Sequence, residues 1–248
     1  MPIILVPTKQ VLSDSQWRAS GELIVQALVE HGSARKEDIR MCPGLGQLKR
    51  AGEVTVEVGW FANIRTDSQK AAVKNALQEG LAETLNYATS DIKVNIVEGE
   101  QAGWVLRDSS SADQAKTNAL LTEVPMVIVA TRQIPDVIKQ HSVADSIIQA
   151  LVTQGGAKKE DVEVCPGYGQ LREDTDASVE ISIGWYSGRT ADQKVVIKKR
   201  IVDSVSVILN VKAFDMNVSL FEARADRWAV RGELIAKKEH AISSTSSS

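Results

Sequence analysis

Hydrophobic and polar positions recur with two different periods along this chain. Val54–Val58 alternates at every second residue, which is typical of a strand with one covered face, and the apolar stretches 2–8 and 92–97 predict two further strands. In 13–30 and 67–87 the apolar positions recur about every 3.6 residues, which predicts two helices. The chain is therefore expected to alternate strands with helices.

Capping residues and a turn delimit these elements. Ser13 or Asp14 is expected to cap the first helix and Thr66 the second, because their side-chain oxygens can accept hydrogen bonds from the first backbone N–H groups of a helix. A short strand is expected at Ile39 to Cys42, before a turn rich in Gly and Pro. This part of the chain thus predicts β-α-β, a turn, and β-α-β again.

The same organisation is present twice. The heptapeptide that begins at Cys42 recurs with one change at Cys165, an offset of 165 − 42 = 123 residues, and the same offset carries Pro2 onto Pro125. Further along, an offset of 124 relates Arg65 to Arg189, Trp104 to Trp228 and Arg107 to Arg231. An internal repeat of this kind predicts two domains with one fold.

The repeat predicts an α+β protein made of two tandem domains. Right-handed crossovers would set the strands of each β-α-β unit parallel and place both helices of a domain on one face of a four-stranded sheet. We expect the first domain at 1–108 and the second at 124–240. Residues 109–123, rich in Ser, Asp, Gln and Thr, are the predicted connection, and 241–248 a predicted disordered tail.

Composition narrows the classes of function. The chain has 29 Lys and Arg against 32 Asp and Glu, a net charge of −3, and so lacks the basic excess that supplies most nucleic-acid affinity. The apolar run from Ile3 to Val6 is far shorter than the roughly 20 residues of a membrane-spanning helix, and no charged signal-peptide region precedes it. We expect a cytoplasmic protein without nucleic-acid or membrane partners, and no motif predicts a metal or another cofactor.

Several segments together resemble the 4-oxalocrotonate tautomerase family. They are Gly188–Lys194, a strand that ends at Glu222, and Trp228–Leu234, and the first half repeats them more loosely in Arg65–Lys70 and Gly103–Arg107. The helix sequence Arg200–Val207 is similar to the cis-3-chloroacrylic acid dehalogenase branch of that superfamily. The resemblance covers nearly the whole chain and implies a tandem fusion of two tautomerase-like domains.

The resemblance implies that Pro2 is the catalytic base once Met1 is removed. The amine of an N-terminal residue has an ordinary pKa of about 7.7–8.0, which apolar surroundings and neighbouring cations lower further. Such an amine can take a proton α to a carbonyl and return it at a conjugated position. The alternative is that Pro2 merely begins a strand, where its missing N–H is harmless. Pro125 lies inside the chain, so its nitrogen is an amide and is expected to be catalytically silent.

The resemblance also implies a clamp for a carboxylate. Arg65 and Arg189 fall where family members bind a substrate carboxylate through the guanidinium fork, with a surface ion pair or a role near a helix cap as the alternative. A second arginine of the family would fall at Lys93 in the first half and at Asn217 in the second. Only Lys93 is a cation, and it lacks the planar fork.

Four further positions are expected to line a binding pocket. Trp104 and Trp228 match an aromatic position that forms a pocket wall in relatives and helps to keep the proline neutral, although aromatic side chains also serve as ordinary core. Arg107 and Arg231, which follow these tryptophans at matching positions of the repeat, are assigned to substrate binding with Lys93.

The function implied is that of an isomerase, a keto–enol tautomerase acting on a small 2-keto or 2-hydroxy unsaturated acid. Hydratase, dehalogenase and decarboxylase variants of the same proline chemistry are alternatives, although the tyrosine of the dehalogenase branch would align with Asn95 or Ser219. A further alternative is a non-catalytic assembly or binding protein on a tautomerase scaffold. The family builds rings from three two-unit domains, so three chains would complete two rings, and a homotrimer is expected.

Overall fold

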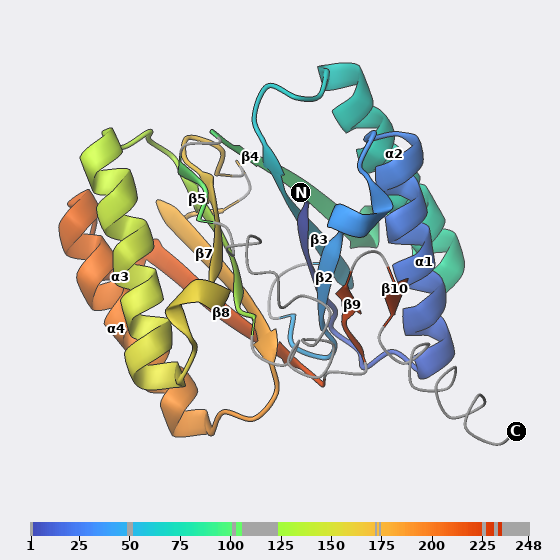
Figure 1. Ribbon diagram of the computed structural model, residues 1–248. Coiled ribbons are helices and arrows are strands. Elements are labelled where there is room, and N and C mark those ends of the chain that lie inside the picture. Colours follow the sequence, from blue (N-terminus) through green and yellow to red (C-terminus); the bar gives the residue numbers. More distant parts are fainter. Residues whose placement is uncertain are drawn as a thin grey trace, which may run out of the picture. The chain divides into compact units, whose positions relative to one another are not determined.

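The computed structural model describes residues 2–48, 52–100, 103–105, 124–171, 173, 175–224, 227–230 and 233–234 (Figure 1). Contacts divide the chain into two compact units. The first unit is Met1–Ile96 together with Ala223–Ser248, and the second unit is Val97–Glu222. Among the described residues, none of the helices has the length and apolar character needed to cross a membrane.

The sheet of the first unit has the strand order β10-β9-β2-β1-β3-β4. Its elements are β1 (Ile3–Pro7), α1 (Asp14–Glu30), β2 (Arg40–Gly44), β3 (Val54–Phe61), α2 (Asp67–Leu85), β4 (Ile92–Gly99), β9 (Ala229–Val230) and β10 (Glu233–Leu234), with 3-10 turns at Lys36–Asp38 and Thr89–Asp91. Strand β1 is parallel to β2 and antiparallel to β3. The last three residues of β4 are counted with the second unit.

The second unit repeats this plan in a sheet of order β6-β5-β7-β8. Its elements are β5 (Met126–Thr131), α3 (Val137–Gly155), β6 (Glu163–Gly167), β7 (Val179–Tyr186), α4 (Ala191–Leu209) and β8 (Met216–Ala223), with 3-10 turns at Lys159–Asp161 and Ala213–Asp215. Strand β5 is parallel to β6 and antiparallel to β7. The predicted α+β class, with two mixed four-stranded β-α-β arrangements that each carry two helices, is confirmed.

One face of each sheet packs against a pair of helices (Figure 1). In the first unit the core beneath α1 and α2 contains alternate strand residues such as Ile4, Val58 and Trp60, packed against Leu28 and Leu77 of the helices. Because successive strand residues point to opposite faces, this alternation is the period of two seen in the sequence. The alternation predicted for Val54–Val58 is therefore present, but the expectation of a single covered face is wrong, since Thr55 and Glu57 on the opposite face are also buried.

The predicted helix starts agree with the structure, whereas one predicted helix end does not. The side chains of Ser13 and Thr66 cap α1 and α2, and each forms a capping box with a glutamine at the third helical position. Helix α2 ends at Leu85 rather than at Tyr87. Asn86 adopts the left-handed conformation, with φ 58°, and the chain turns there, a position that Asn tolerates better than most residues.

Strand pairing refines the alignment of the two halves. Ile3 pairs with Gly59 and Met126 pairs with Gly184, so in these strands the offset is 184 − 59 = 125 residues. The tryptophans that follow, Trp60 and Trp185, are therefore equivalent. The change from an offset of 123 reflects a longer connection before β7 than before β3.

A short segment pairs with the outer edge of the second strand in each unit, β2 or β6. In the first unit β9 pairs antiparallel with β2, Ala229 opposite Met41. In the second unit Val105 bridges Val164 through backbone hydrogen bonds of 3.1 and 2.9 Å. These pairs are equivalent in the repeat, and each adds hydrogen bonds to a strand edge that would otherwise be open. Each segment follows the last strand of one sequence half and is counted with the unit built from the other half.

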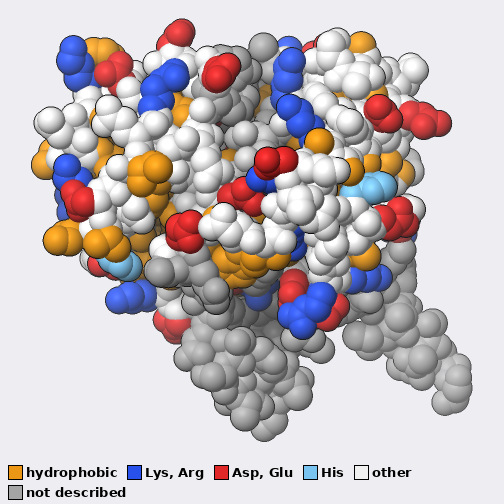
Figure 2. All heavy atoms as spheres, turned by 90° about the horizontal axis from the view of Figure 1, so that it is seen from above, with side chains coloured by type: hydrophobic (Ala, Val, Ile, Leu, Met, Phe, Trp, Pro, Cys, Tyr) orange, Lys and Arg blue, Asp and Glu red, His pale blue; other side chains and the backbone are white. Residues whose placement is uncertain are grey.

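Charged side chains of both signs are interspersed on the face of the molecule drawn in Figure 2, without a broad basic area. This distribution agrees with the net charge of −3.

Replacement of Trp17 by Phe is expected to loosen the C-terminal segment of the first unit. The Trp17 side chain is 2% exposed, and its Nε1 donates a 2.7 Å hydrogen bond to the carbonyl of Arg227, just before β9. Loss of this bond should lower the free energy of unfolding by about 1 kcal/mol, measured by urea denaturation. Val11→Ala, at a side chain that is 75% exposed, is the control and should change it by less than about 0.5 kcal/mol. Equal stability of Trp17→Phe and the wild type would contradict the role of this contact.

Candidate functional site

Pro2 lies buried at the start of β1. Its carbonyl accepts a 3.3 Å hydrogen bond from the backbone N–H of Arg40 in the neighbouring β2. On the other side, the antiparallel register that pairs Ile3 with Gly59 brings the next position of β3, Trp60, beside Pro2. Proline has no N–H to donate to this ladder, so the first position of the strand is where it costs no hydrogen bond.

Arg65 covers the Trp60 indole at this end of the first unit. The guanidinium carbon lies 3.8 Å from the ring centroid, a cation–π contact, and Nε donates a 2.8 Å hydrogen bond to the carbonyl of Gly32. A Cβ at Gly32 would lie 2.3 Å from the Trp60 ring, so only glycine fits there without displacement of the indole. Gly32, Trp60 and Arg65, together called the first stack, fix the guanidinium at the end of the sheet where β1 begins.

The second unit contains an equivalent arrangement, the second stack, formed by Gly155, Trp185 and Arg189. The guanidinium carbon of Arg189 lies 3.5 Å from the Trp185 centroid. A Cβ at Gly155 would lie 2.4 Å from the same indole. Both arginines predicted as clamps therefore rest on a tryptophan at the corresponding end of their own sheet.

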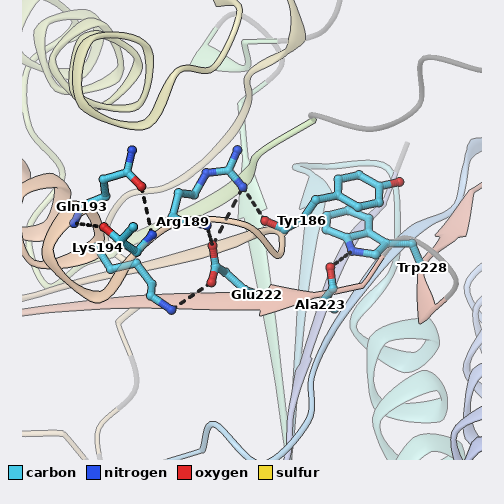
Figure 3. A network of polar contacts seen from close by, with 8 residues as sticks. Tyr186, Arg189, Gln193, Lys194, Glu222, Ala223 and Trp228 are labelled. Carbon is cyan, nitrogen blue, oxygen red and sulfur yellow. Dashed lines mark hydrogen bonds and ion pairs between the residues drawn. The ribbon is translucent and has the colours of Figure 1, made fainter.

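Glu222 of β8 forms an ion-pair network with the second stack (Figure 3). Its carboxylate accepts a 3.2 Å hydrogen bond from the backbone N–H of Arg189, lies 3.9 Å from the Arg189 guanidinium, and accepts a 2.9 Å hydrogen bond from Lys194 Nζ. The guanidinium also donates to the carbonyl of Tyr186. The Glu222 and Arg189 side chains are only 9% and 12% exposed, so this pair is largely shielded from water.

This network determines what Arg189 can do chemically. A carboxylate from the protein already accompanies its guanidinium, and an incoming substrate carboxylate would compete with Glu222 for the same positive charge. In the first stack Arg65 lies over the Trp60 indole and donates to the Gly32 carbonyl. The position equivalent to Glu222 in the first sequence half is also a glutamate, Glu98.

Trp104 and Trp228 are buried and make equivalent hydrogen bonds. Trp104 Nε1 donates to the Gly99 carbonyl at 3.0 Å, and Trp228 Nε1 donates to the Ala223 carbonyl at 3.4 Å. Trp104 is counted with the second unit, whereas Trp228 belongs to the first unit, which also contains Pro2. The tryptophan that shares a unit with Pro2 is therefore the one from the second sequence half.

Lys93 lies far from Pro2 within the first unit. It stands between Ile92 and Val94, which face the helices, so its side chain points to the opposite face of the sheet. The backbone at Gly52, just before β3, approaches Lys93, because a Cβ there would be 3.3 Å from Lys93 Cγ. Pro2 lies beside the other end of β3, roughly six residues or about 20 Å away. The first unit does not bring these two residues together.

The remaining predicted residues are placed as follows. Pro125 is buried at the start of β5, and its carbonyl accepts a 3.0 Å hydrogen bond from the N–H of Glu163. Arg107 and Arg231 lie outside the described residues. Within the described ranges, no three His, Cys, Asp or Glu side chains lie close enough to hold a metal ion.

The sequence interpretation missed three kinds of residue in these sites: the stacking tryptophans Trp60 and Trp185, the glycines Gly32 and Gly155, and Glu222. A signal for the first kind was present, since a tryptophan precedes the arginine by five residues in one half and four in the other. The glycines and Glu222 lie in separate elements, so no local pattern connects them to the arginines.

Comparison with models of known protein families gives no match, and comparison with curated protein sequences gives none either. Several solved structures are similar to the chain. A fused 4-OT solved as an asymmetric trimer is 18% identical, spans 46% of this chain and 98% of its own, and has a TM-score of 0.40. A member of the cis-3-chloroacrylic acid dehalogenase family is 22% identical, with 48% and 90% covered and a TM-score of 0.37. A malonate semialdehyde decarboxylase inhibited by 3-bromopropiolate is 18% identical, with 43% and 87% covered and a TM-score of 0.34.

Replacement of Glu222 by Gln is expected to destabilise the second unit. The amide keeps the shape of the side chain but removes the negative charge that accompanies Arg189 and Lys194. Hydrogen bonds to charged groups contribute more than neutral ones, so the free energy of unfolding should fall by about 2 kcal/mol in urea denaturation.

A matched control for this variant lies on helix α4. Asp203 accepts a 2.7 Å hydrogen bond from Lys199, but both side chains are more than half exposed. An exposed pair contributes little, so Asp203→Asn should lower stability by less than about 1 kcal/mol. A loss for Glu222→Gln no larger than for this control would show that the buried network adds nothing beyond an ordinary surface pair.

Proposed function

We propose that the chain is an isomerase, a keto–enol tautomerase that uses Pro2 as a general base on a small 2-keto or 2-hydroxy unsaturated acid. The observation that carries the proposal is the convergence of Pro2, Trp60 and Arg65 at one end of the first unit. Pro2 is buried at the start of β1, β3 brings Trp60 beside it, and the Arg65 guanidinium lies over that indole. A base, an apolar surface and a fixed cation are the groups that this chemistry requires.

Removal of Met1 would convert the nitrogen of Pro2 into a secondary amine. Buried surroundings disfavour the protonated, charged form of an amine and so lower its pKa, and a nearby guanidinium acts in the same direction. The neutral amine takes a proton from the carbon next to the substrate carbonyl, and the resulting ammonium returns a proton at the conjugated position. The reaction moves one proton and shifts the double bonds within the substrate, without oxidation or reduction, so it needs no oxidant and no cofactor.

Arg65 is the proposed carboxylate clamp because it lies over Trp60, next to Pro2 in the first unit, whereas Arg189 belongs to the second unit. Of the two tryptophans assigned to the pocket wall, Trp228 is the one counted in the same unit as Pro2, and it is buried. Lys93, Arg107 and Arg231 remain proposed substrate-binding residues. Lys93 would have to come from another copy of the chain, since its own unit keeps it about 20 Å from Pro2.

Loss of activity in Pro2→Ala is the direct test of the mechanism. Alanine leaves a primary amine with a different basicity and without the ring, so enol–keto conversion of phenylenolpyruvate, followed by ultraviolet absorbance, should slow by about 100-fold or more, within the usual contribution of a general base. Pro125→Ala is the matched control, because the Pro125 nitrogen is an amide and its replacement should leave the rate unchanged. An intact mass must show that Met1 is absent in both proteins. Equal rates for wild type and Pro2→Ala would eliminate the proline mechanism.

A homotrimer belongs to the same proposal. Tautomerase-like rings contain three two-unit domains, and three chains would supply six domains, enough for two closed rings. Native mass spectrometry is expected to give about three times the 26.9 kDa of one chain. A monomer at micromolar concentration would remove the assembly and, with it, any contribution of Lys93 from another copy. A cytoplasmic location is likewise proposed, from composition alone.

A second candidate function is a non-catalytic assembly or binding protein on the same scaffold. The specific observation in its favour is that the second unit retains the arginine stack while Glu222 compensates its charge and Pro125 offers only an amide. A hydratase, dehalogenase or decarboxylase that uses the same proline is a variant of the first proposal. These variants are distinguished by substrate assays on 3-carbon acids, whereas the binding protein would be inactive in all of them.

A further inference from the structure

The second unit contains a groove with a volume of about 520 Å³ at the end of its sheet where β5 finishes. This volume falls within the range of about 300–1,000 Å³ that is usual for small-molecule sites. Its wall combines apolar and charged side chains, among them Arg132, Lys139, Ser178, Leu209 and Val211.

The first unit carries different side chains at the positions equivalent to those that line this groove. Lys9, Glu53 and Tyr87 occupy backbone sites equivalent to Arg132, Ser178 and Val211. The equivalence rests on matched hydrogen bonds. The N–H of Lys9 donates to the Glu53 carbonyl at 2.9 Å, and that of Arg132 donates to the Ser178 carbonyl at 3.1 Å.

Two more backbone bonds support the same equivalence. The Glu53 N–H donates to the carbonyl of Asp91 at 2.9 Å, and the Ser178 N–H donates to that of Asp215 at 2.7 Å. Tyr87 and Val211 both follow a left-handed asparagine at the end of a helix. The two backbones therefore agree here, and the difference between the units lies in the side chains.

Large side chains occupy this region in the first unit. Lys9 Nζ forms a 3.2 Å ion pair with Glu53, and Tyr87 packs half-buried against the core. Burial and the nearby charge of Glu53 raise the pKa of the Tyr87 phenol, in agreement with a ring close to that carboxylate. The first unit thus fills the space with a phenol and a neutralised cation.

The second unit replaces both bulky groups. Serine in place of Glu53 and valine in place of Tyr87 remove a carboxylate and a phenol, which opens space between the end of β5, the start of β7 and the end of α4. Arg132 instead donates through Nε to the Ala177 carbonyl at 3.1 Å. Lys139 adds a second cation, 3.9 Å from the exposed Asp136. Two cations against one carboxylate give the groove one net positive charge, whereas Lys9 and Glu53 cancel.

We propose that this groove is a binding site for a small organic anion with a short hydrocarbon body, such as a medium-chain carboxylate. Leu209 and Val211 offer apolar contact to the hydrocarbon, and Arg132 and Lys139 attract the anionic head group. The ion pair of Lys139 with Asp136 is exposed and weak, so the ammonium can turn to a ligand at little cost.

The groove is separate from the proposed proline chemistry. All the residues that line it belong to the second unit, whereas Pro2, Trp60 and Arg65 belong to the first. Anion binding here therefore does not depend on Pro2 or on activity, and the two proposals can fail independently.

Octanoate is the probe, titrated into the full-length protein by isothermal calorimetry in the Pro2→Ala background to reduce binding at the proline site. The double variant Ser178→Glu, Val211→Tyr rebuilds the filled arrangement of the first unit. It should weaken octanoate binding by at least about tenfold, because it removes the space and supplies a competing carboxylate. Circular dichroism is expected to be unchanged, since the same residues are already accommodated on this backbone in the first unit.

Two further measurements keep the test decisive. Lys139→Gln, at an exposed position, should weaken octanoate binding about threefold and leave binding of the uncharged 1-octanol unchanged. The converse double variant Glu53→Ser, Tyr87→Val should add a second octanoate site in the first unit. The Pro2→Ala protein without further substitutions is the reference. The proposal is overturned if this reference shows no saturable binding at millimolar octanoate. It is also overturned if the double variant (Ser178→Glu with Val211→Tyr) and the Lys139→Gln variant both bind octanoate as tightly as the reference.

Discussion

The first strand of each unit is hydrogen-bonded on both sides, and this double register positions the candidate sites. Strand β1 lies between a parallel neighbour and an antiparallel one, so neither can slip by a residue without turning its side chains to the wrong face. Proline cannot donate to such a ladder, and Pro2 and Pro125 stand just before the first residue of a central strand. The same register brings Trp60 beside Pro2. Gly32, which follows α1, and Arg65, which precedes α2, complete the first stack.

Much of the fold followed from periodicity, because burial on one face is a local property of a strand or helix. The period of two in Val54–Val58 and the caps at Ser13 and Thr66 were sufficient to predict β3, α1 and α2. The pairing of β9 with β2 could not be predicted, since a two-residue strand carries no periodic signal and either half offers an open edge. The pairing depends on which edge is available in three dimensions, which the order of the residues does not reveal.

The candidate sites were predictable only in part. Pro2, Arg65 and Arg189 came from a family resemblance, and the structure locates each at the end of its sheet where the first strand begins. Their surroundings were hidden, because Glu222 reaches Arg189 from a strand 33 residues later and a lone glutamate on a strand has no pattern of its own. The distance between Lys93 and Pro2 could not be predicted either. It depends on the strand pairing, which places Lys93 near the start of β3 and Pro2 near its end.

Duplication explains how one backbone can hold two chemistries. The hydrogen bonds that build each unit come from main-chain atoms, so side chains at their ends can change without loss of the fold. At the end of the second sheet far from its stack, such a change removes a phenol and a carboxylate and leaves a groove beside Arg132. The two copies can thus carry different side chains at the ends of their strands while the backbone hydrogen bonds that they share are kept.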